Sequence, residues 1–513
     1  MLFNSFSFLC FYLPIVFIGF YWLGKRSEIL AATWLGLASL FFYAWWDYRY
    51  LPLLLASIIF NYLCGWRIAE SGSLAKKRWL IMSVVCNLVL LGYYKYAVFF
   101  VSAFSGITGN PVSITEIALP IGISFFTFTQ IAFLVDTYQG KVKEYRFIHY
   151  LLFVTYFPHL IAGPVLHHKE MMPQFADSKN YRLSALNVAV GLSIFIIGLA
   201  KKVLIADNIA PYANDLFNNP QAPSLLVAWG GVLAYTFQIY FDFSGYSDMA
   251  IGLSRLFGVR LPLNFNSPYK STSIIEFWRR WHMTLSRFLR DYLYIGLGGN
   301  RYGVVRRYAN LMITMLLGGL WHGAGWTFVF WGGLHGTYLV VNHAWLAMAN
   351  KLDFPLDRPS WKIAGTAITF ISVCFSWVFF RSADLNAAEQ IINGLVGGFG
   401  VGIPNGLAVH LGGGKLLLEQ AGVDFYLGGG ARFLETWSWV LVAGGIAFFL
   451  PNTQQIMRLF EPALNFHPAQ TVAAFTGEKC WRPNRQWALA LGFIATLCLL
   501  SLNRPSEFLY FQF

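Results

Sequence analysis

The sequence predicts an all-α integral membrane protein with about nine to twelve spanning helices and further re-entrant or interfacial helices. The first observation is composition, because the 513 residues are 57% hydrophobic and only 12% charged, too few charges to cover a soluble globule. The second is the recurrence of apolar stretches long enough to cross a bilayer. They lie near residues 6–23, 29–46, 51–66, 79–94, 118–135, 183–200, 225–241, 311–341, 361–380, 437–450 and 486–502.

The charges beside the early apolar stretches predict their orientation. No basic residue precedes the first stretch, and Lys25 and Arg26 follow it, which is the reverse of a cleavable secretory signal. Basic clusters recur at 67–78, after the third stretch, and at 141–146, after the fifth. Because cytoplasmic loops retain an excess of Lys and Arg, these loops are expected in the cytoplasm and the N-terminus outside.

The positive charge of the chain does not indicate nucleic-acid binding. The formal net charge is +13, but the basic residues flank apolar stretches and no nucleic-acid-binding motif is visible. Anionic lipid headgroups or a phosphorylated cosubstrate are the expected partners.

The chain is interpreted as a single membrane domain whose parts differ in composition. Residues 250–310 hold ten Lys or Arg and only two acidic residues, which a spanning helix would not tolerate and an interfacial helix would. The glycine-rich stretch 394–430 favours a mobile loop outside the membrane. The parts are N-terminal scaffold spans at 1–135, a core at 136–350 with a re-entrant or interfacial section at 242–310, and C-terminal spans at 351–513.

His322 is the first candidate for chemistry. It lies in GGLWHGAGW, within residues 311–350, which contain no Asp, Glu, Lys or Arg. An ionisable group at membrane depth is costly, and the flanking glycines let a substrate approach closely. Burial would keep the imidazole neutral, with one ring nitrogen able to accept a proton, which suits a general base. From the residues alone, a structural role is about equally favoured.

His282 is the second candidate. In EFWRRWHMTLSRFLRDYLYIGLGG, Trp278, His282 and Ser286 recur every four residues and would share one face of a helix. The same segment carries a cationic band that could bind the phosphates of an acyl donor or anchor lipid headgroups. The band consists of Arg279, Arg280, Arg287 and Arg290.

Other polar residues are weaker candidates. His335 would lie about 20 Å from His322 along an unbroken helix, so the two would not act together. The histidines at 159, 167 and 168 lack acidic or cysteine ligands at zinc-site spacing, so no metal site is predicted. Asp242 stands where a nucleophile elbow at Ser244 would need glycine, so Asp242 and Asp248 are interpreted as orienting or structural groups.

The motifs together resemble the membrane-bound O-acyltransferase family, in particular its bacterial subgroup that acetylates alginate and other exopolysaccharides. The resemblance covers almost the whole chain. It rests on LPIGISFFTFTQIAFLVDTYQG, FPHLIAGPVLHHKEMMPQF, YFDFSGYSDMAIGLSRLFG, FWRRWHMTLSRFLRDYLYIGLGG, LWHGAGWTFVFWGGLHG and the terminal FLYFQF. It implies that His322 is the essential intramembrane histidine and that His282 is the second polar residue of the site.

The resemblance also implies a fold and a reaction. The fold would be many helices around a thinned, histidine-containing channel in a bacterial inner membrane, where the N-terminus that the charges place outside would be periplasmic. Acetyl-CoA or another cytoplasmic thioester would be the cosubstrate, with no bound cofactor. The acceptor would be an exopolysaccharide hydroxyl or a periplasmic partner enzyme.

Two alternatives stay open. One is a related enzyme that takes an aminoacyl or acyl group from a carrier protein to a cell-wall polymer. The other is a polysaccharide or lipid transporter without chemistry, in which the histidines and arginines line a path.

Overall fold

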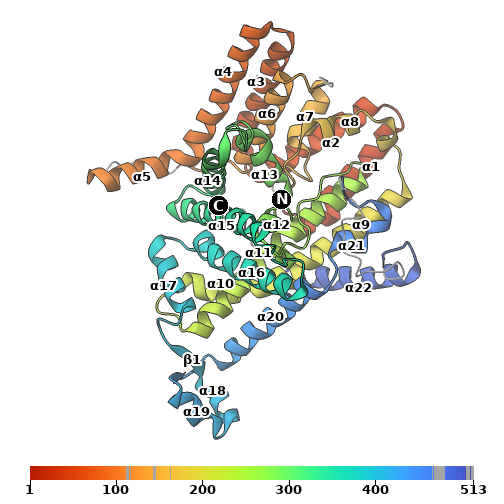
Figure 1. Cartoon of the computed structure of the whole chain (residues 1–513). Helices are drawn as coiled ribbons and strands as arrows, with labels where there is room; N and C mark the ends of the chain where they lie inside the picture. Colours follow the sequence, from red (N-terminus) through yellow and green to blue (C-terminus); the bar gives the residue numbers. More distant parts are fainter. Residues whose placement is uncertain are drawn as a thin grey trace. The chain divides into compact units, whose positions relative to one another are not determined.

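The computed structural model is mainly helical, with two short strands in the part of the chain that it describes (Figure 1). It describes residues 1–110, 115, 117–142, 146–161, 163–464, 466, 480–503 and 509. Contacts between Cα atoms divide the chain into two compact units. Unit 1 comprises 1–200, 245–264 and 453–504, and unit 2 comprises 201–244, 265–452 and 505–513.

Unit 1 contains the N-terminal helices. Its helices are α1 (Leu13–Gly24), α2 (Glu28–Ala44), α3 (Leu51–Glu70), α4 (Ser73–Leu91), α5 (Ala97–Thr108), α6 (Ile123–Tyr138), α7 (Phe147–Thr155), α8 (His168–Phe175), α9 (Ala185–Ala200), the last part of α11 (Leu225–Leu256), α21 (Thr453–Ile456) and α22 (Arg485–Ser501). α1 packs on α2, α3 packs on α4 and α6, and α22 packs on α9. Unit 1 therefore combines the N-terminal helices with two helices, α21 and α22, from late in the sequence.

Unit 2 contains both candidate histidines. Its helices are α10 (Asp207–Asn218), the first part of α11 (Leu225–Leu256), α12 (Ile274–Trp278), α13 (Met283–Phe288), α14 (Gly303–His322), α15 (Trp326–Lys351), α16 (Pro359–Arg381), α17 (Leu385–Leu395), α18 (Asn405–Ala408), α19 (Gly414–Gln420) and α20 (Gly430–Phe449). Its core is rich in aromatic side chains, including Tyr235, Phe277, Trp331 and Trp377, each no more than 1% exposed.

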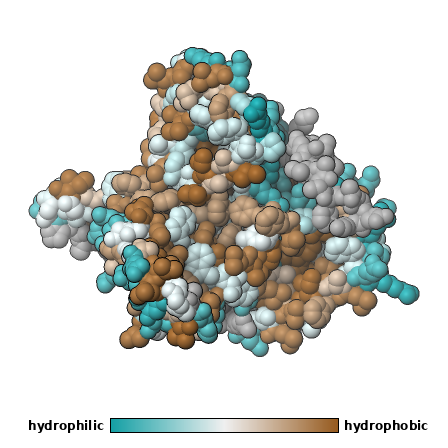
Figure 2. All heavy atoms as spheres, turned by 60° about the horizontal axis from the view of Figure 1, so that its bottom comes forward, coloured by the Kyte–Doolittle hydropathy of each residue, from teal (hydrophilic) through white to brown (hydrophobic). Residues whose placement is uncertain are grey.

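The predicted class, a polytopic all-α membrane protein, is confirmed. Within the part of the chain that the structure describes, five helical segments are long and apolar enough to cross a bilayer. Large apolar side chains such as Phe11, Ile107 and Phe449 are more than half exposed, and hydrophobic residues cover much of the face shown in Figure 2. The five segments are Ser7–Gly24, Tyr48–Glu70, Ser73–Thr108, Ala185–Asn218 and Pro359–Arg381, and Glu28–Ala44 and Arg485–Ser501 are shorter apolar helices.

Three predicted segments have different boundaries. The basic section expected from residue 242 begins later, because α11 continues unbroken to Leu256. The stretch 311–341 is two helices, since α14 ends at His322 and α15 begins at Trp326.

The third is the glycine-rich stretch 394–430, which is not a structureless loop. The short strands β1 (Val401–Pro404) and β2 (Val423–Tyr426) pair in parallel, and α18 and α19 lie between them in the chain. Gly400 and Gly422, directly before the two strands, have φ of +74° and +86°, a conformation that glycine adopts without strain. These glycines therefore form turns that lead into paired strands.

Candidate functional site

His322 lies at the turn of a tight helical hairpin. It is the last residue of α14, and Gly323, Ala324 and Gly325 separate it from α15, which runs back along α14. Gly323 has extended backbone, which stops the helix directly after the histidine. The imidazole is thus placed at the inner end of the hairpin and is only 8% exposed.

Glycines allow the two helices of this hairpin to pack closely. A Cβ on Gly332 would lie 2.4 Å from the carbonyl oxygen of Met315, and one on Gly319 would lie 2.2 Å from that of Phe328. Neither distance is possible for a larger residue without moving backbone, so small residues set the separation of α14 and α15. The position of His322 relative to α15 follows from this separation.

Aromatic side chains surround the His322 ring. Trp331 on α15 and Phe380 on α16 each lie edge-on to it, with ring centroids 5.1 Å from the imidazole centroid. Trp321, the preceding residue, lies at 5.0 Å. Edge-on contacts of this kind fix a ring's orientation and exclude water, so the imidazole is held in an apolar setting of low dielectric.

His282 lies between two short helices and not within one. α12 ends at Trp278, α13 begins at Met283, and His282 is its N-cap with φ 42° and ψ 51°. The predicted single helix with Trp278, His282 and Ser286 on one face is therefore wrong. Left-handed backbone is unfavourable for a residue with a Cβ and persists only where neighbouring contacts enforce it. With this backbone conformation, the His282 ring is fully buried.

The two candidate histidines lie together. Their ring centroids are 6.4 Å apart, which is too long for a direct hydrogen bond between the rings and short enough for one small group to contact both. Phe243 on α11 lies edge-on to His282 at 4.8 Å, and Trp321 lies 6.3 Å from it. Segments far apart in sequence thus form one aromatic enclosure around two imidazoles, in unit 2.

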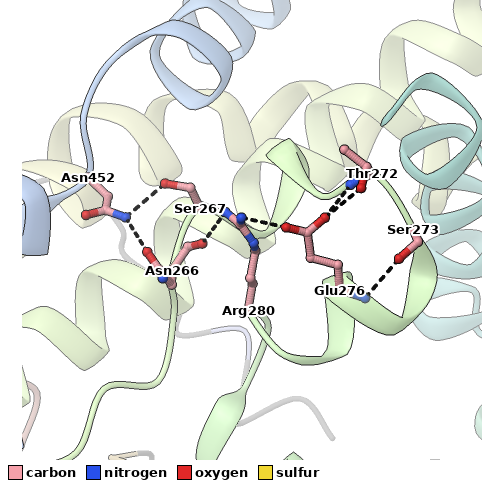
Figure 3. A network of polar contacts seen from close by, with 7 residues as sticks. All are labelled: Asn266, Ser267, Thr272, Ser273, Glu276, Arg280 and Asn452. Carbon is pink, nitrogen blue, oxygen red and sulfur yellow. Dashed lines mark hydrogen bonds and ion pairs between the residues drawn. The ribbon is translucent and has the colours of Figure 1, made fainter. Parts of the chain in front are cut away.

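A network of polar contacts holds the segment that ends at His282 (Figure 3). The Asn452 amide, after α20, donates to Asn266 Oδ1 at 3.0 Å and to Ser267 Oγ at 2.9 Å. The Asn266 N–H donates to the Arg280 carbonyl at 2.9 Å, which closes the segment into a loop. Ser267, like His282, has left-handed backbone, with φ 49°. We name Asn266, Ser267, Glu276, Arg280 and Asn452 the clasp.

Glu276 and Arg280 form the charged part of the clasp. Arg280 Nη2 lies 2.6 Å from Glu276 Oε1, and Glu276 Oε2 accepts bonds from the Thr272 N–H and hydroxyl at 2.8 and 2.9 Å. Burial raises the pKa of the Glu276 carboxyl, but the bonds from Thr272 and the Arg280 charge outweigh burial, so the pKa lies below its usual value. Glu276 therefore stays ionised and keeps its partners.

The predicted cationic band is divided in the structure. Arg280 pairs with Glu276, and Arg290 pairs with Asp291 at 2.8 Å, so these two guanidinium groups are already neutralised. Arg279 is exposed, and Arg287 lies on α13. The four arginines therefore do not form one uniform surface for phosphates.

A buried ion cluster near the site was not predicted from the sequence. Lys202 Nζ lies 2.7 Å from Asp207 Oδ1 and 2.6 Å from Asp242 Oδ1, and the lysine side chain is 3% exposed. Asp242 Oδ2 accepts the N–H of Leu509 at 3.1 Å. Asp242 directly precedes Phe243, the residue that packs on His282. These contacts give Asp242 the orienting or structural role expected from the sequence. The feature of the sequence that could have predicted the ion cluster was the pair of lysines at 201–202 in an apolar stretch.

His335 is closer to the site than an unbroken helix would place it. The hairpin folds α15 back, and Trp331 lies between the two histidines, 5.1 Å from the His322 ring and 4.8 Å from that of His335. The Ser376 hydroxyl donates to the Val373 carbonyl at 2.7 Å and contacts His335 Nε2 at 2.9 Å, so it accepts from that nitrogen. His335 thus helps to orient Trp331, which lies between it and His322.

The histidines at 159, 167 and 168, considered for a metal site from the sequence, belong to unit 1. His168 Nδ1 lies 3.2 Å from Asp136 Oδ2, and His159 and His167 are buried. Within the described ranges, no group of three or more His, Cys, Asp or Glu side chains could hold a metal ion.

Known proteins resemble this chain over most of its length. The model of the membrane-bound O-acyltransferase family matches residues 29–386, which cross both units and include both candidate histidines. A peptidoglycan O-acetyltransferase of Helicobacter pylori is 46% identical, over 79% of this chain and 81% of its own. A protein of Pseudomonas putida named "Probable alginate O-acetylase AlgI" is 39% identical over the full length of both chains. A teichoic acid D-alanyltransferase of Streptococcus thermophilus is 29% identical, over 51% of this chain and 68% of its own.

The extent of these matches exceeds what a shared motif would give. The family match covers the scaffold helices from α2 onward, the hairpin with His322 and the segment with His282. With the helical fold and the buried pair of imidazoles, it establishes that the chain is an O-acyltransferase and belongs to the membrane-bound O-acyltransferase family.

Proposed function

We propose that the protein transfers an acetyl group from acetyl-CoA, a cytoplasmic thioester, to a polysaccharide hydroxyl outside the cytoplasm. Alginate and peptidoglycan are the candidate acceptors, because the similar relatives carry these names. The transfer is either direct or passes through a periplasmic partner enzyme. The observation that carries the proposal is the pair of buried imidazoles, 6.4 Å apart in an aromatic enclosure, within the family-matching segment.

In the proposed reaction His322 is the general base. Its neutral imidazole takes the proton of the acceptor hydroxyl while the hydroxyl oxygen attacks the thioester carbonyl carbon. The carbon–sulfur bond then breaks, the thiolate takes the proton from His322, and the acetyl ester and free thiol leave. An acyl-histidine would give the same products, and trapping such an adduct distinguishes the two routes.

The magnitude of base catalysis limits what His322 can contribute. General-base assistance gives about 10²- to 10⁴-fold in rate, or roughly 3 to 5 kcal/mol of barrier. Positioning of the thioester and hydroxyl must supply much of the remainder. His282, fully buried beside His322, is the proposed orienting group, and the exposed Arg279 is a proposed contact for donor phosphates.

We place the protein in the bacterial inner membrane with its N-terminus in the periplasm. The basic residues after the first, third and fifth predicted spans support this orientation. Donor and acceptor would then reach the histidines from opposite sides, through the thinned centre expected of the family.

Aminoacyl transfer is the second candidate, and the D-alanyltransferase relative favours it. That relative is 29% identical over half of this chain, against 46% over 79% for the peptidoglycan O-acetyltransferase, so acetyl transfer is the better supported. Capture of an acyl carrier protein by the purified chain, with no response to acetyl-CoA, would reverse this order.

The proposal is tested by His322→Ala and His282→Ala in cells that acetylate the polymer. We expect polymer O-acetylation to fall to background with His322→Ala and by about 10²-fold with His282→Ala. The matched control is His343→Gln, a partly exposed histidine on α15 that should leave acetylation unchanged. Each variant is also purified to show that it is folded. Undiminished acetylation with folded His322→Ala would contradict the mechanism and favour a transporter.

A further inference from the structure

A cavity of about 820 Å³ lies in unit 1, at the end of α1. Its apolar wall is formed by Phe17, Ile18 and Trp22 on α1, and its polar wall includes Lys25 and Arg182. Arg182 follows the 3-10 turn Ser178–Tyr181, so the cavity joins two segments that are distant in sequence. None of these residues takes part in the proposed reaction.

The polar wall has an excess of positive charge. Lys25 and Arg182 are exposed, and across the described ranges no carboxylate lies within ion-pair distance of either. Glu28 is the carboxylate that lines the cavity. Two cations and one anion leave this wall with a net charge of +1, which an anionic group would neutralise.

The apolar wall continues onto the outer surface of the unit. Ile18 is 66% exposed, and Trp22 is 54% exposed, with the Arg26 guanidinium 4.4 Å from its ring centroid. Tryptophan beside a cation is typical of the boundary between hydrocarbon and headgroups. Phe17 and Ile18 lie deeper along α1, where hydrocarbon would be.

The cavity thus combines a cationic end at the interface with an apolar end in the membrane. A free phosphate would use the first and leave the second exposed, whereas a phospholipid uses both. Basic pockets between helices on the cytoplasmic side bind anionic headgroups, and Lys25 and Arg26 are predicted to be cytoplasmic.

We propose that this cavity binds an anionic phospholipid. Lys25 and Arg182 hold the phosphate through charge-assisted hydrogen bonds, and one acyl chain lies on Phe17 and Ile18. The bound lipid links the turn between α1 and α2 to the segment around Arg182. This site is separate from the proposed reaction and does not depend on it.

The test is native mass spectrometry of the purified full-length protein with phosphatidylglycerol and, separately, phosphatidylcholine of the same acyl chains. We expect tighter binding of phosphatidylglycerol, and about 30-fold weaker binding of it by Lys25→Gln/Arg182→Gln, from about 1 kcal/mol for each cation. Glu28→Gln should change the affinity in the opposite direction, to roughly fivefold tighter.

The matched control is Lys76→Gln/Lys77→Gln, which removes the same charge from the start of α4, outside the cavity. We expect it to bind phosphatidylglycerol like the unmodified protein. An equal loss in the control would overturn the proposal, because it would show general attraction to basic loops. Displacement of the lipid by millimolar inorganic phosphate or CoA would also overturn it, in favour of a soluble phosphate ligand.

Discussion

At the scale of single residues, the candidate site contains polar side chains in an apolar interior. Burying such side chains costs free energy unless each has a definite partner. Trp331 separates His322 from His335, and Ser376 holds His335 through its Nε2–H. Asp242 anchors the backbone beside Phe243, which packs on His282. Each imidazole is therefore oriented by a neighbour that is itself held by a hydrogen bond, an ion pair or a ring contact.

Lys202→Met tests the ion cluster. Removing the lysine leaves Asp207 and Asp242 without their common cation, so we expect a loss of roughly 3 to 5 kcal/mol in the free energy of unfolding. Lys202→Met/Asp242→Asn should recover part of that loss, because it removes one of the two uncompensated charges. Thermal unfolding in detergent measures both.

The control for this prediction is Lys77→Met, an exposed lysine on α4 that should change stability by less than about 0.5 kcal/mol. Equal effects of the two lysine substitutions would contradict a special role for the buried cluster.

The residues of the candidate site differ in how far the sequence could predict them. His322 was predictable, because an ionisable residue in an uncharged apolar segment can be recognised from the neighbouring sequence alone. The pairing of Lys202 with Asp242 was not, because the acid lies on another helix and only folding brings it to the lysine. Asn452 gave no signal for the same reason, since its partners are in the segment before His282.

At the scale of elements, the hairpin of α14 and α15 determines where His322 lies. Gly332→Ala would place a Cβ 2.4 Å from the Met315 carbonyl oxygen, so the helices must separate. We expect a loss of about 1 to 3 kcal/mol in stability and a further loss of acyl transfer as His322 moves.

Gly333→Ala is the matched control for the hairpin. Its Cβ would meet only the end of the Leu316 side chain, at 3.6 Å, so near-normal stability and activity are expected. The two purified variants are compared by thermal unfolding and by acetyl transfer. If Gly332→Ala behaved like Gly333→Ala, close packing would not be what positions His322.

The clasp gives a second prediction at this scale. Asn452→Ala removes the hydrogen bonds to Asn266 Oδ1 and to Ser267 Oγ, and Ser267 has left-handed backbone, so the loop that ends at His282 should relax. We expect kcat to fall about tenfold with little change in KM for the donor, equivalent to about 1.4 kcal/mol of barrier. Ser267→Gly in the same chain should restore part of kcat, because glycine adopts positive φ without strain.

Asn484→Ala is the control for the clasp. It also removes an asparagine hydrogen bond, the N-cap of α22 to the Trp487 N–H at 2.9 Å, but in unit 1. A loss of stability with unchanged kcat is expected. If Ser267→Gly failed to restore activity to Asn452→Ala, the clasp would be ordinary structure and not a device that positions His282.

Element boundaries show where local patterns mislead. The four-residue spacing from Trp278 to Ser286 predicted one helix, but α12 ends at Trp278 and left-handed backbone at His282, directly after the clasp, interrupts the helical run. The glycines of 394–430 predicted a loop, and several are turn residues around two paired strands. Both outcomes depend on contacts with distant segments, which periodicity does not contain.

At the scale of the whole molecule, composition and family motifs predict the class and the chemistry. The apolar exposed surface and long apolar helices confirm an all-α membrane protein, and the family match confirms an O-acyltransferase. The donor, the acceptor and the side of the membrane from which each arrives stay predictions. They depend on the bilayer and on molecules that bind from either side.

The most direct test of the central claim is acetyl transfer in proteoliposomes of uniform orientation. Labelled acetyl-CoA is supplied only on the side that carries Lys25 and Arg26, and the polysaccharide acceptor, with any partner enzyme, only on the other side. We predict label on the polymer with the unmodified protein and with His343→Gln, and none above background with folded His322→Ala. Equal labelling with His322→Ala, or transfer only when both substrates share one side, would contradict the account.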